Sequence, residues 1–341
     1  MKSQLENRAA QVAVIGAGSW GTVLAWLLGE KETRVRLWAR DEKTANSLTA
    51  TRKNVKYLPN TVLQNVEFTA DLNAAVQGAK HIVIAIPGAA TPALAAEFRT
   101  LSIEHDAVII SGTKGLHPES GLRASQIWRD AGWNMENYVA LSGPNLSKEI
   151  AAGVPTSSVV ASQNLAAAQS AQRLFASPLF RVYTNCDLIG VELGGALKNV
   201  VAIAAGVGDG LGFGDNAKAS LLTRGWHEMT RLAMALGAKE STLFGLSGMG
   251  DLFATCTSCQ SRNHALGVLL GKGESLQQAR ESVVQTAEGV HTTRAALRLA
   301  AEVGIELPVT QQVAAVLFEG KSPAEAVGDL MKRQERDEVE L

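Results

Sequence analysis

The stretch from Gln11 to Leu28 reads Gln-Val-Ala-Val-Ile-Gly-Ala-Gly-Ser-Trp-Gly-Thr-Val-Leu-Ala-Trp-Leu-Leu. A short apolar run, a glycine-rich turn and a longer apolar run follow one another, and this order predicts a buried strand, a turn and a buried helix. The turn has the pattern G-x-G-x-x-G. Gly16 permits the tight turn, Gly18 lets a pyrophosphate approach the backbone, and Gly21 lets the helix pack close to the strand. The stretch therefore predicts a dinucleotide site with the anion at a helix N-terminus.

The same glycine pattern also occurs in turns that bind nothing, so its surroundings decide its meaning. After the predicted helix, Arg34 to Trp38 reads as a second strand, which completes the βαβ unit expected around a dinucleotide site. Further apolar runs predict strands over residues 66–69, 81–86, 107–110, 138–141, 158–161 and 180–183. Strands that alternate with helices predict a parallel, doubly wound sheet, whose ligands bind outside the carboxyl ends of the strands.

The composition narrows the classes of function. A chain of 341 residues, 46% of them hydrophobic, has enough core material for about two domains. Its net charge of -1 provides no electrostatic footprint for nucleic acid. Residues 1–10 are polar, so we expect a flexible N-terminus there, and no uninterrupted apolar run reaches the roughly 18 residues of a membrane span. We therefore expect a cytoplasmic protein that acts on small molecules.

The three cysteines, Cys186, Cys256 and Cys259, are too few for a disulfide framework and indicate a reducing compartment. Cys256 and Cys259 form a Cys-x-x-Cys pair. His264 alone does not supply the two further ligands that a zinc site needs, and a thioredoxin-like site would place the motif after an early strand. We interpret the pair as two unlinked thiols and expect no metal site.

The sequence pattern changes at Asp187. From there to the end, the apolar residues follow helical periodicity, with helices expected over residues 188–207, 217–236, 266–270, 292–302, 311–318 and 323–331. We expect a nucleotide domain over residues 11–186 and an all-helical domain over residues 187–341, with a cleft between them. The predicted fold class is α/β: a Rossmann-like doubly wound sheet followed by an all-α domain.

The helix that opens the second domain carries an unusual lysine. Residues 193–205 are apolar or small on every face except at Lys198 and Asn199, so this helix should be largely buried. Lysine is almost never fully buried without a partner. One interpretation is that Lys198 extends its ammonium group to solvent at the edge of the domain. We favour the other, in which Lys198 points into the cleft and acts as a general acid or base.

Other polar residues are predicted to lie near the same cleft. Lys114 and Asn145 follow the ends of two predicted strands, where ligands of such sheets bind, although Lys114 also suits a solvated loop. In the second domain, Ser261-Arg262-Asn263 stands at a predicted helix start. A guanidinium group and backbone donors there suit a phosphate, although the same residues suit a capped helix that faces solvent.

From Gln11 to about Met331, the chain resembles the NAD(P)-dependent glycerol-3-phosphate dehydrogenases of bacterial type. The motifs that carry the resemblance are long and specific. They are Gly16-Ala17-Gly18-Ser19-Trp20-Gly21-Thr22, Tyr57-Leu58-Pro59-Asn60, Lys114-Gly115, Ser142-Gly143-Pro144, the run from Gly190 to Asn199, Gly214-Asp215-Asn216-Ala217-Lys218-Ala219, Gly250-Asp251-Leu252, Ser261-Arg262-Asn263 and Glu288-Gly289-Val290.

The resemblance implies reversible reduction of dihydroxyacetone phosphate to sn-glycerol 3-phosphate, which supplies phospholipid synthesis, by a homodimer. It makes Lys198 the proton acceptor, and we expect Lys114 to act as a second positive group and Asp251 to orient the ammonium of Lys198. The substrate would contact Lys114, Gly143, Asn145, Lys198, Asp251, Ser261, Arg262 and Asn263. The cofactor would contact Gly16, Gly18, Ser19, Trp20, Gly21, Arg40, Tyr57, Lys114, Ser147, Arg262, Thr286 and Glu288.

Details of the chain leave the individual contacts and the cofactor open. Asn145 and Ser147 stand where the family usually has serine or threonine and a small residue such as alanine. Arg40, followed by Asp41 at the end of the second strand, favours NADP without excluding NAD. One alternative function is a related NAD(P)-dependent hydroxy-acid or hydroxyacyl dehydrogenase, which would need a base such as histidine in a comparable setting. Another is a non-catalytic dinucleotide-binding protein, which would be expected to lose the buried polar residues of the second domain.

Overall fold

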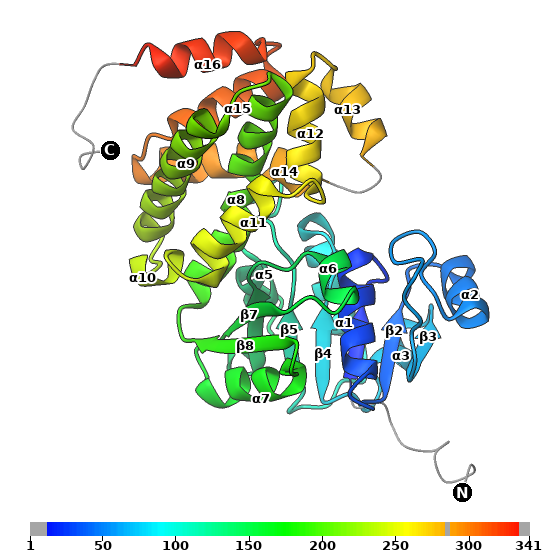
Figure 1. The fold of residues 1–341 in the computed structure, drawn as a ribbon. Helices are drawn as coiled ribbons and strands as arrows, with labels where there is room; N and C mark the ends of the chain where they lie inside the picture. Colours follow the sequence, from blue (N-terminus) through cyan, green and yellow to red (C-terminus); the bar gives the residue numbers. More distant parts are fainter. Residues whose placement is uncertain (1–11, 284–286, 334–341) are drawn as a thin grey trace, which may run out of the picture.

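The computed structural model describes residues 12–283 and 287–333, so the expected flexible N-terminus lies outside the described residues. The first half of the chain forms one sheet in the order β3-β2-β1-β4-β5-β6-β7-β8, with helices on both faces (Figure 1). Its strands are β1 (Val12–Ile15), β2 (Val35–Trp38), β3 (Val66–Thr69), β4 (His81–Ile84), β5 (Val108–Ser111), β6 (Tyr138–Ser142), β7 (Thr156–Ala161) and β8 (Phe180–Asn185).

The direction of β7 differs from the predicted parallel sheet. Strands β1 to β6 pair with one another in parallel, whereas β7 is antiparallel to β6 and parallel to β8. The link between β6 and β7 contains only the five-residue helix α6 (Ser147–Ala151). At 1.5 Å per residue, that helix is about 7.5 Å long, too short to carry the chain back along a strand of about 17 Å. The chain therefore turns back at the carboxyl end of β6 and runs antiparallel to it as β7.

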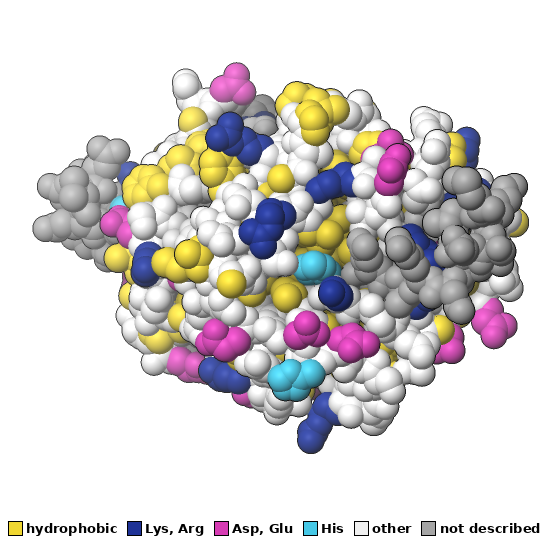
Figure 2. All heavy atoms as spheres, turned by 90° about the horizontal axis from the view of Figure 1, so that it is seen from below, with side chains coloured by type: hydrophobic (Ala, Val, Ile, Leu, Met, Phe, Trp, Pro, Cys, Tyr) yellow, Lys and Arg dark blue, Asp and Glu magenta, His cyan; other side chains and the backbone are white. Residues whose placement is uncertain are grey.

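The two faces of the sheet have separate cores, because successive residues of a strand point to opposite faces. Val12 and Val14 pack with α1 and α7, whereas Ala13 and Ile15 pack with α3, α4 and α5. The helices of this half are α1 (Ser19–Gly29), α2 (Glu42–Thr51), α3 (Leu72–Val76), α4 (Thr91–Phe98), α5 (Ala124–Asp130), α6 and α7 (Leu165–Phe175). On the face seen from below, basic and acidic side chains are interspersed, in keeping with the net charge of -1 (Figure 2).

The second half is helical in the described residues, which confirms the predicted fold class. Its helices surround α8 and lie above the carboxyl ends of the strands in Figure 1. They are α8 (Leu188–Gly210), α9 (Asp215–Ala235), α10 (Glu240–Leu243), α11 (Asp251–Thr257), α12 (Arg262–Gly271), α13 (Leu276–Ser282), α14 (Glu288–Val303), α15 (Pro308–Phe318) and α16 (Pro323–Met331).

Helix α8 is the central element of this half. Its 23 residues are long and apolar enough to cross a membrane by length and composition alone, but 89% of its apolar window is buried inside the protein. Such burial is typical of a core helix that is apolar on nearly every face. We therefore interpret α8 as the core of the helical half.

Helices α8 and α12 touch backbone to backbone through four glycines. A Cβ atom on Gly206 would lie 2.1 Å from the carbonyl oxygen of His264, and one on Gly267 would lie 2.1 Å from that of Ile203. One turn further along each helix, Gly210 and Gly271 make the same kind of contact at 2.4 Å. No larger residue fits at these positions unless the helices move apart. The contact fixes the start of α12 beside the middle of α8.

This contact predicts that Gly267→Ala lowers the stability of the protein. The added methyl group overlaps a backbone atom, and overpacking of this kind typically costs about 1–3 kcal/mol. Gly328→Ala in α16 is the matched control, because its Cβ would meet no described atom within 4 Å and alanine favours a helix by about 1 kcal/mol over glycine. Thermal unfolding should show a lower midpoint for the first variant and an equal or higher one for the second. Equal midpoints for wild type and Gly267→Ala would contradict the close contact.

Candidate active site

The glycine-rich turn between β1 and α1 has the geometry that its sequence predicts. Gly16 has a φ of 112°, and a Cβ atom there would lie 2.6 Å from the carbonyl oxygen of Ala85. A Cβ atom on Gly21 would lie 1.9 Å from the carbonyl oxygen of Gly16, so the helix touches the turn. At Gly18 a Cβ atom would meet no described atom within 4 Å. The backbone ahead of Ser19 is thus open, and a pyrophosphate fits at this helix N-terminus.

The loop after α2 is fastened to the same turn by Asn54. Its amide donates to the carbonyl oxygen of Ala17 at 3.0 Å and to the hydroxyl of Thr22 at 2.8 Å. Asn54 and Thr22 are both buried. These bonds hold the segment that carries Tyr57 beside the turn. Trp20, in the first turn of α1, lies against Gly112, where a Cβ atom would be 2.5 Å from the indole Nε1.

Arg40 and Asp41 follow β2 and differ in their surroundings. The carboxylate of Asp41 caps α2, because it accepts from the backbone N–H of Thr44 at 2.8 Å and from its hydroxyl at 3.0 Å. This hydrogen bonding lowers the pKa of Asp41. The side chain of Arg40 is exposed. The acid that would suit a ribose hydroxyl is therefore already used in a helix cap.

Three charged side chains meet where the two halves of the chain join. Asp251, the first residue of α11, accepts from Lys198 of α8 at 2.6 Å and from Lys114, which follows β5, at 2.8 Å. Asp251 and Lys198 are buried, and Lys114 is half-buried. The sequence predicted that these three residues act together, and the structure brings them together. We call them the lysine–aspartate cluster.

A single turn of π-helix over residues 246–250 delivers Asp251 to this position. One glycine lets the turn approach α8, and a second lets the turn close against the end of α10. A Cβ atom on Gly194 would lie 2.6 Å from the carbonyl oxygen of Ser247, and one on Gly248 would lie 2.0 Å from that of Leu243. Because Gly194 stands four residues before Lys198, close to one helical turn, the Asp251 carboxylate meets the lysine on the same side of α8.

The cluster carries two ammonium groups against one carboxylate, so its net charge is positive. Burial alone would raise the pKa of Asp251, but the charges and hydrogen bonds of Lys114 and Lys198 outweigh it and lower that pKa. Burial lowers the pKa of Lys114 to about 8, against the opposing effect of Asp251, and the charges of Lys198 and Arg262 lower it further. A positive, partly dehydrated site of this kind stabilises a developing oxyanion.

Lys114 also contacts the loop after β6. Its ammonium donates to the carbonyl oxygen of Gly143 at 2.7 Å and approaches the side-chain oxygen of Asn145 at 3.5 Å. Gly143 has a φ of 120°, in the region that favours glycine. The Asn145 amide donates to the hydroxyl of Ser158 at 3.1 Å. Lys114 therefore links the sheet, the loop after β6 and the helical half.

The start of α12 lies beside the cluster, but two of its three predicted residues have protein partners. The Ser261 hydroxyl caps α12 by accepting from the backbone N–H of His264 at 3.2 Å. The Asn263 amide donates to the side-chain oxygen of Asn199 at 2.9 Å and accepts from the backbone N–H of Gly289 at 2.9 Å. These contacts hold Ser261 and Asn263 in place within the protein.

Arg262 and Glu288 form a second charged group between α12 and α14. Burial raises the pKa of Glu288, while Arg262 and a hydrogen bond from the backbone N–H of Gly88 act against it. Arg262 is the first residue of α12. Desolvation lowers the pKa of its guanidinium, and the charges of Glu288 and Tyr57 act in the opposite direction. The predicted cofactor contacts at Arg262, Glu288 and Tyr57 thus lie near one another. Thr286 lies outside the described residues.

Comparisons with known proteins agree with this arrangement. Residues 11–168 match the sequence model of the NAD-dependent glycerol-3-phosphate dehydrogenase N-terminus, and residues 187–328 match that of its C-terminus. The chain belongs to this family. A glycerol-3-phosphate dehydrogenase (NAD(P)+) from Pelotomaculum thermopropionicum is 46% identical over 97% of this chain and 96% of its own. One from Moorella thermoacetica is 46% identical over 96% and 98%.

A solved structure is similar over the same extent. The crystal structure of glycerol-3-phosphate dehydrogenase from Coxiella burnetii superimposes with a TM-score of 0.91 at 38% identity. The match covers 95% of this chain and 99% of the other. The resemblance noted in the sequence to the NAD(P)-dependent glycerol-3-phosphate dehydrogenase family is therefore confirmed.

Thr255 also belongs to this site, and the sequence analysis did not identify it. Its hydroxyl accepts from the ammonium of Lys198 at 2.6 Å and donates to the carboxylate of Asp251 at 3.1 Å. Thr255 follows Asp251 by four residues on α11, so the two lie on one face of the helix. That spacing was visible in the sequence, but α11 is too short to show a helical pattern.

The two cysteines of the Cys-x-x-Cys pair differ in burial. Cys256 is buried, and this burial raises the pKa of its thiol to about 12, whereas Cys259 is exposed. Among residues 12–283 and 287–333, no group of three or more histidine, cysteine, aspartate or glutamate side chains is arranged to hold a metal ion. Ser147, the other position at which the chain departs from the family pattern, begins α6.

Lys114 provides a pH test of the lysine–aspartate cluster. The pKa of its ammonium is about 8 in the folded protein and 10.5 ordinarily. Between these values the unfolded chain binds more protons than the folded chain, so the free energy of unfolding rises with pH through this window. Lys114→Met removes the titrating group, and the rise should be absent from its thermal unfolding midpoints. Lys148→Met, at an exposed lysine, is the control and should follow wild type. Parallel curves for wild type and Lys114→Met would refute the lowered pKa.

Proposed function

We propose that the protein catalyses the reversible reduction of dihydroxyacetone phosphate to sn-glycerol 3-phosphate with NADH or NADPH. Its relatives from Pelotomaculum thermopropionicum and Moorella thermoacetica, both named glycerol-3-phosphate dehydrogenase (NAD(P)+), support this reaction. The observation that carries the proposal is the Lys114–Asp251–Lys198 cluster at the carboxyl end of the sheet, because its net positive charge would stabilise a ketone oxygen that becomes an alkoxide. We further propose a cytoplasmic homodimer that supplies phospholipid synthesis, with domains at residues 11–186 and 187–341.

The proposed cofactor site follows the glycine-rich turn. The open backbone at Gly18 and the helix start at Ser19 fit a dinucleotide. A bound nicotinamide supplies or accepts the hydride. We assign to the cofactor Gly16, Gly18, Ser19, Trp20, Gly21, Arg40, Tyr57, Lys114, Ser147, Arg262, Thr286 and Glu288.

The proposed substrate site adjoins the lysine–aspartate cluster. Arg262 stands at a helix start, where its guanidinium fork and the backbone donors suit the substrate phosphate. Ser261 and Asn263 hydrogen-bond within the protein, and these contacts would hold the start of α12 in place beside the substrate. We assign to the substrate Lys114, Gly143, Asn145, Lys198, Asp251, Ser261, Arg262 and Asn263.

The proton chemistry is assigned to Lys198. An ammonium has three N–H donors, and two of them are directed at Asp251 and Thr255. Within residues 12–283 and 287–333 the third has no hydrogen-bond partner and is available for the substrate oxygen. As the carbonyl carbon accepts a hydride, Lys198 donates this proton to the oxygen, and Lys114 stabilises the developing charge. In the reverse direction the neutral amine of Lys198 accepts the hydroxyl proton.

Lys198→Met tests this assignment. The variant should fold and still bind NADPH, while its kcat falls by a factor of about a hundred or more, the usual scale for loss of a general acid or base. Wild type and variant are incubated with dihydroxyacetone phosphate and NADPH or NADH while the absorbance of the reduced nicotinamide is followed. Lys148→Met is the control and should retain full activity.

Other outcomes of this assay would redirect the proposal. Near-normal turnover by a folded Lys198→Met variant would assign the proton transfer to another group, with Lys114 as the next candidate. No turnover by wild type, despite measurable NADPH binding, would favour the non-catalytic dinucleotide-binding protein. Turnover of a hydroxy acid instead would favour the related dehydrogenase class. His264, the histidine nearest in sequence to the proposed phosphate site, is paired with Asp209 at 2.8 Å, which speaks against it as the base of such an enzyme.

Cofactor choice is proposed to favour NADP through Arg40. Because Asp41 is engaged in the cap of α2, the exposed guanidinium of Arg40 is the charged group available to a 2′-phosphate at the end of β2. Arg40→Ala should raise the KM for NADPH about tenfold, since a hydrogen bond to a charged group contributes about 1.5–3 kcal/mol. The KM for NADH should change little. A change in the KM for NADH alone would refute the assignment.

A further inference from the structure

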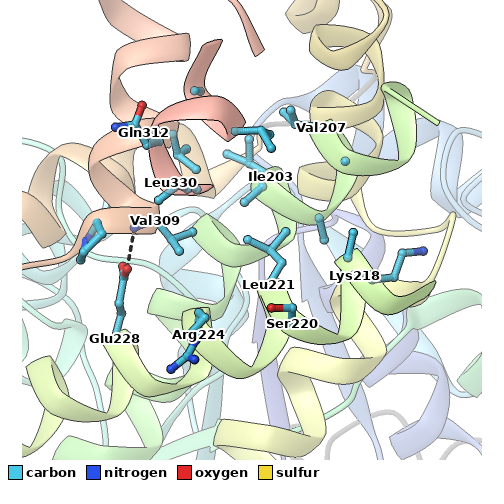
Figure 3. A pocket seen from close by; sticks show the side chains of 18 of the residues that line it. Ile203, Val207, Lys218, Ser220, Leu221, Arg224, Glu228, Val309, Gln312 and Leu330 are labelled. Atoms are coloured by element: carbon cyan, nitrogen blue, oxygen red, sulfur yellow. Dashed lines mark hydrogen bonds between the residues drawn. The ribbon is translucent and has the colours of Figure 1, made fainter. Parts of the chain in front are cut away.

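The helical half contains a cavity that the proposed reaction does not use. Its volume is about 520 Å³, within the range of roughly 300–1,000 Å³ typical of sites for small ligands. It lies among α8, α9, α15 and α16 (Figure 3). Ile203 and Val207 line it from α8, Val309 and Val313 from α15, and Leu330 from α16. Most of its wall is therefore aliphatic and suits an alkyl chain.

One stripe of α9 forms the remaining wall and carries positive charge. Leu221, Arg224, Glu228 and Arg231 follow one another at spacings of three and four residues, so they share one face of the helix. Figure 3 shows the first three of these side chains along the helix at the edge of the cavity. The stripe thus places two arginines beside an apolar space.

Both arginines have donors that the described protein does not satisfy. No hydrogen bond or ion pair joins Arg224 to another residue in the ranges 12–283 and 287–333, although its side chain is half-buried. Arg231 donates from Nη2 to the carbonyl oxygen of Glu306 at 2.5 Å, but its Nε is buried and has no partner among the same residues. A buried donor without an acceptor is costly, as at Nε of Arg231, and the half-buried guanidinium of Arg224 carries a charge that no described residue pairs, so both groups are suited to an anion.

The acidic residues that line the cavity are committed elsewhere. Glu228 accepts from the backbone N–H groups of Val309 at 2.5 Å and Thr310 at 3.2 Å, and it thereby caps α15. Burial raises the pKa of Glu228 to about 7, so it carries only part of a negative charge near neutral pH. Asp209 pairs with Lys218 at 2.8 Å. Glu306, the third acid of the lining, pairs with Arg333 at 3.6 Å, so none of these acids forms an ion pair with Arg224.

We propose that this cavity binds an amphipathic anion, with an alkyl chain between α8, α15 and α16 and a carboxylate or phosphate head on Arg224 and Arg231. The aliphatic wall explains the chain, and the unsatisfied guanidinium donors explain the head. A second copy of the protein could also cover the apolar wall, but the space is enclosed among four helices and has the volume of a small-ligand site. Charge complementarity therefore selects the anion.

The test uses decanoate and decyl phosphate as probes, in isothermal titration calorimetry on the full chain below the concentration at which either probe aggregates. Wild type should bind at least one probe, and butanoate should bind more than tenfold more weakly, because it lacks most of the alkyl chain. Arg224→Gln should weaken the binding about tenfold, whereas Arg224→Lys should weaken it less. Arg129→Gln, at an exposed arginine of α5, should bind like wild type. The probe that binds more tightly identifies the preferred head group.

A second variant fills the cavity. Leu221→Trp should abolish binding of both probes while dehydrogenase turnover, which also reports a folded chain, stays unchanged. Equal affinity for wild type, Arg224→Gln and Leu221→Trp would mean that the probes bind non-specifically, and the proposal would be wrong. No heat with either probe would also refute it. If Leu221→Trp altered the oligomeric state in sedimentation without any probe binding to wild type, a second copy would be the occupant instead.

Discussion

The ion pair between Asp251 and two lysines is the contact on which the arrangement of this protein depends. Lys114 comes from the sheet, and Lys198 and Asp251 come from the helical half, so the same carboxylate joins the halves and orders the proposed active site. A buried pair that loses one partner typically costs about 3–5 kcal/mol, because a charge is left uncompensated. Loss of Asp251 would therefore leave two ammonium groups without a counter-charge, whereas loss of one lysine would leave a matched pair. The contact between the two halves and the proposed reaction thus depend on the same three side chains.

A second buried carboxylate reinforces this contact from the start of α8. Glu192 accepts from the guanidinium of Arg123 at 2.7 Å, from the backbone N–H of Ser125 at 2.8 Å and from the hydroxyl of Tyr138 at 3.1 Å. All three donors belong to the sheet half. Because Glu192 lies six residues before Lys198 on the same helix, it fixes where α8 leaves the sheet. The lysine is thus positioned from both ends, by Glu192 below it and by the glycine contact with α12 above it.

The sequence predicted what depends on local pattern and failed where several segments must meet. The strands and the long helices were predicted because their apolar residues recur over many positions. Helices α6, α10, α11 and α13 were missed because each is too short to show a period, and the reversal at β7 follows the short α6. Helix α2 was missed because it is mostly polar and buries only Ala45 and Leu48. Lys198 stood out as a charge on an apolar helix. Its partner Thr255 did not, since a threonine on a seven-residue helix has no visible role until α11 docks against α8.

The glycine contact between α8 and α12 bears on how the protein can move. Two helices whose backbones touch have no layer of side chains between them, so neither can slide or rotate without a clash. The middle of α8 and the start of α12 must therefore travel as one rigid piece. If the two halves of the chain shift as ligands enter and leave, the spacing between Lys198 and Arg262 stays constant, and the distance from either residue to the glycine-rich turn is what varies. Opening and closing would then change the distances to the glycine-rich turn and to the proposed substrate contacts of the sheet half, while Lys198 and Arg262 keep their geometry relative to each other.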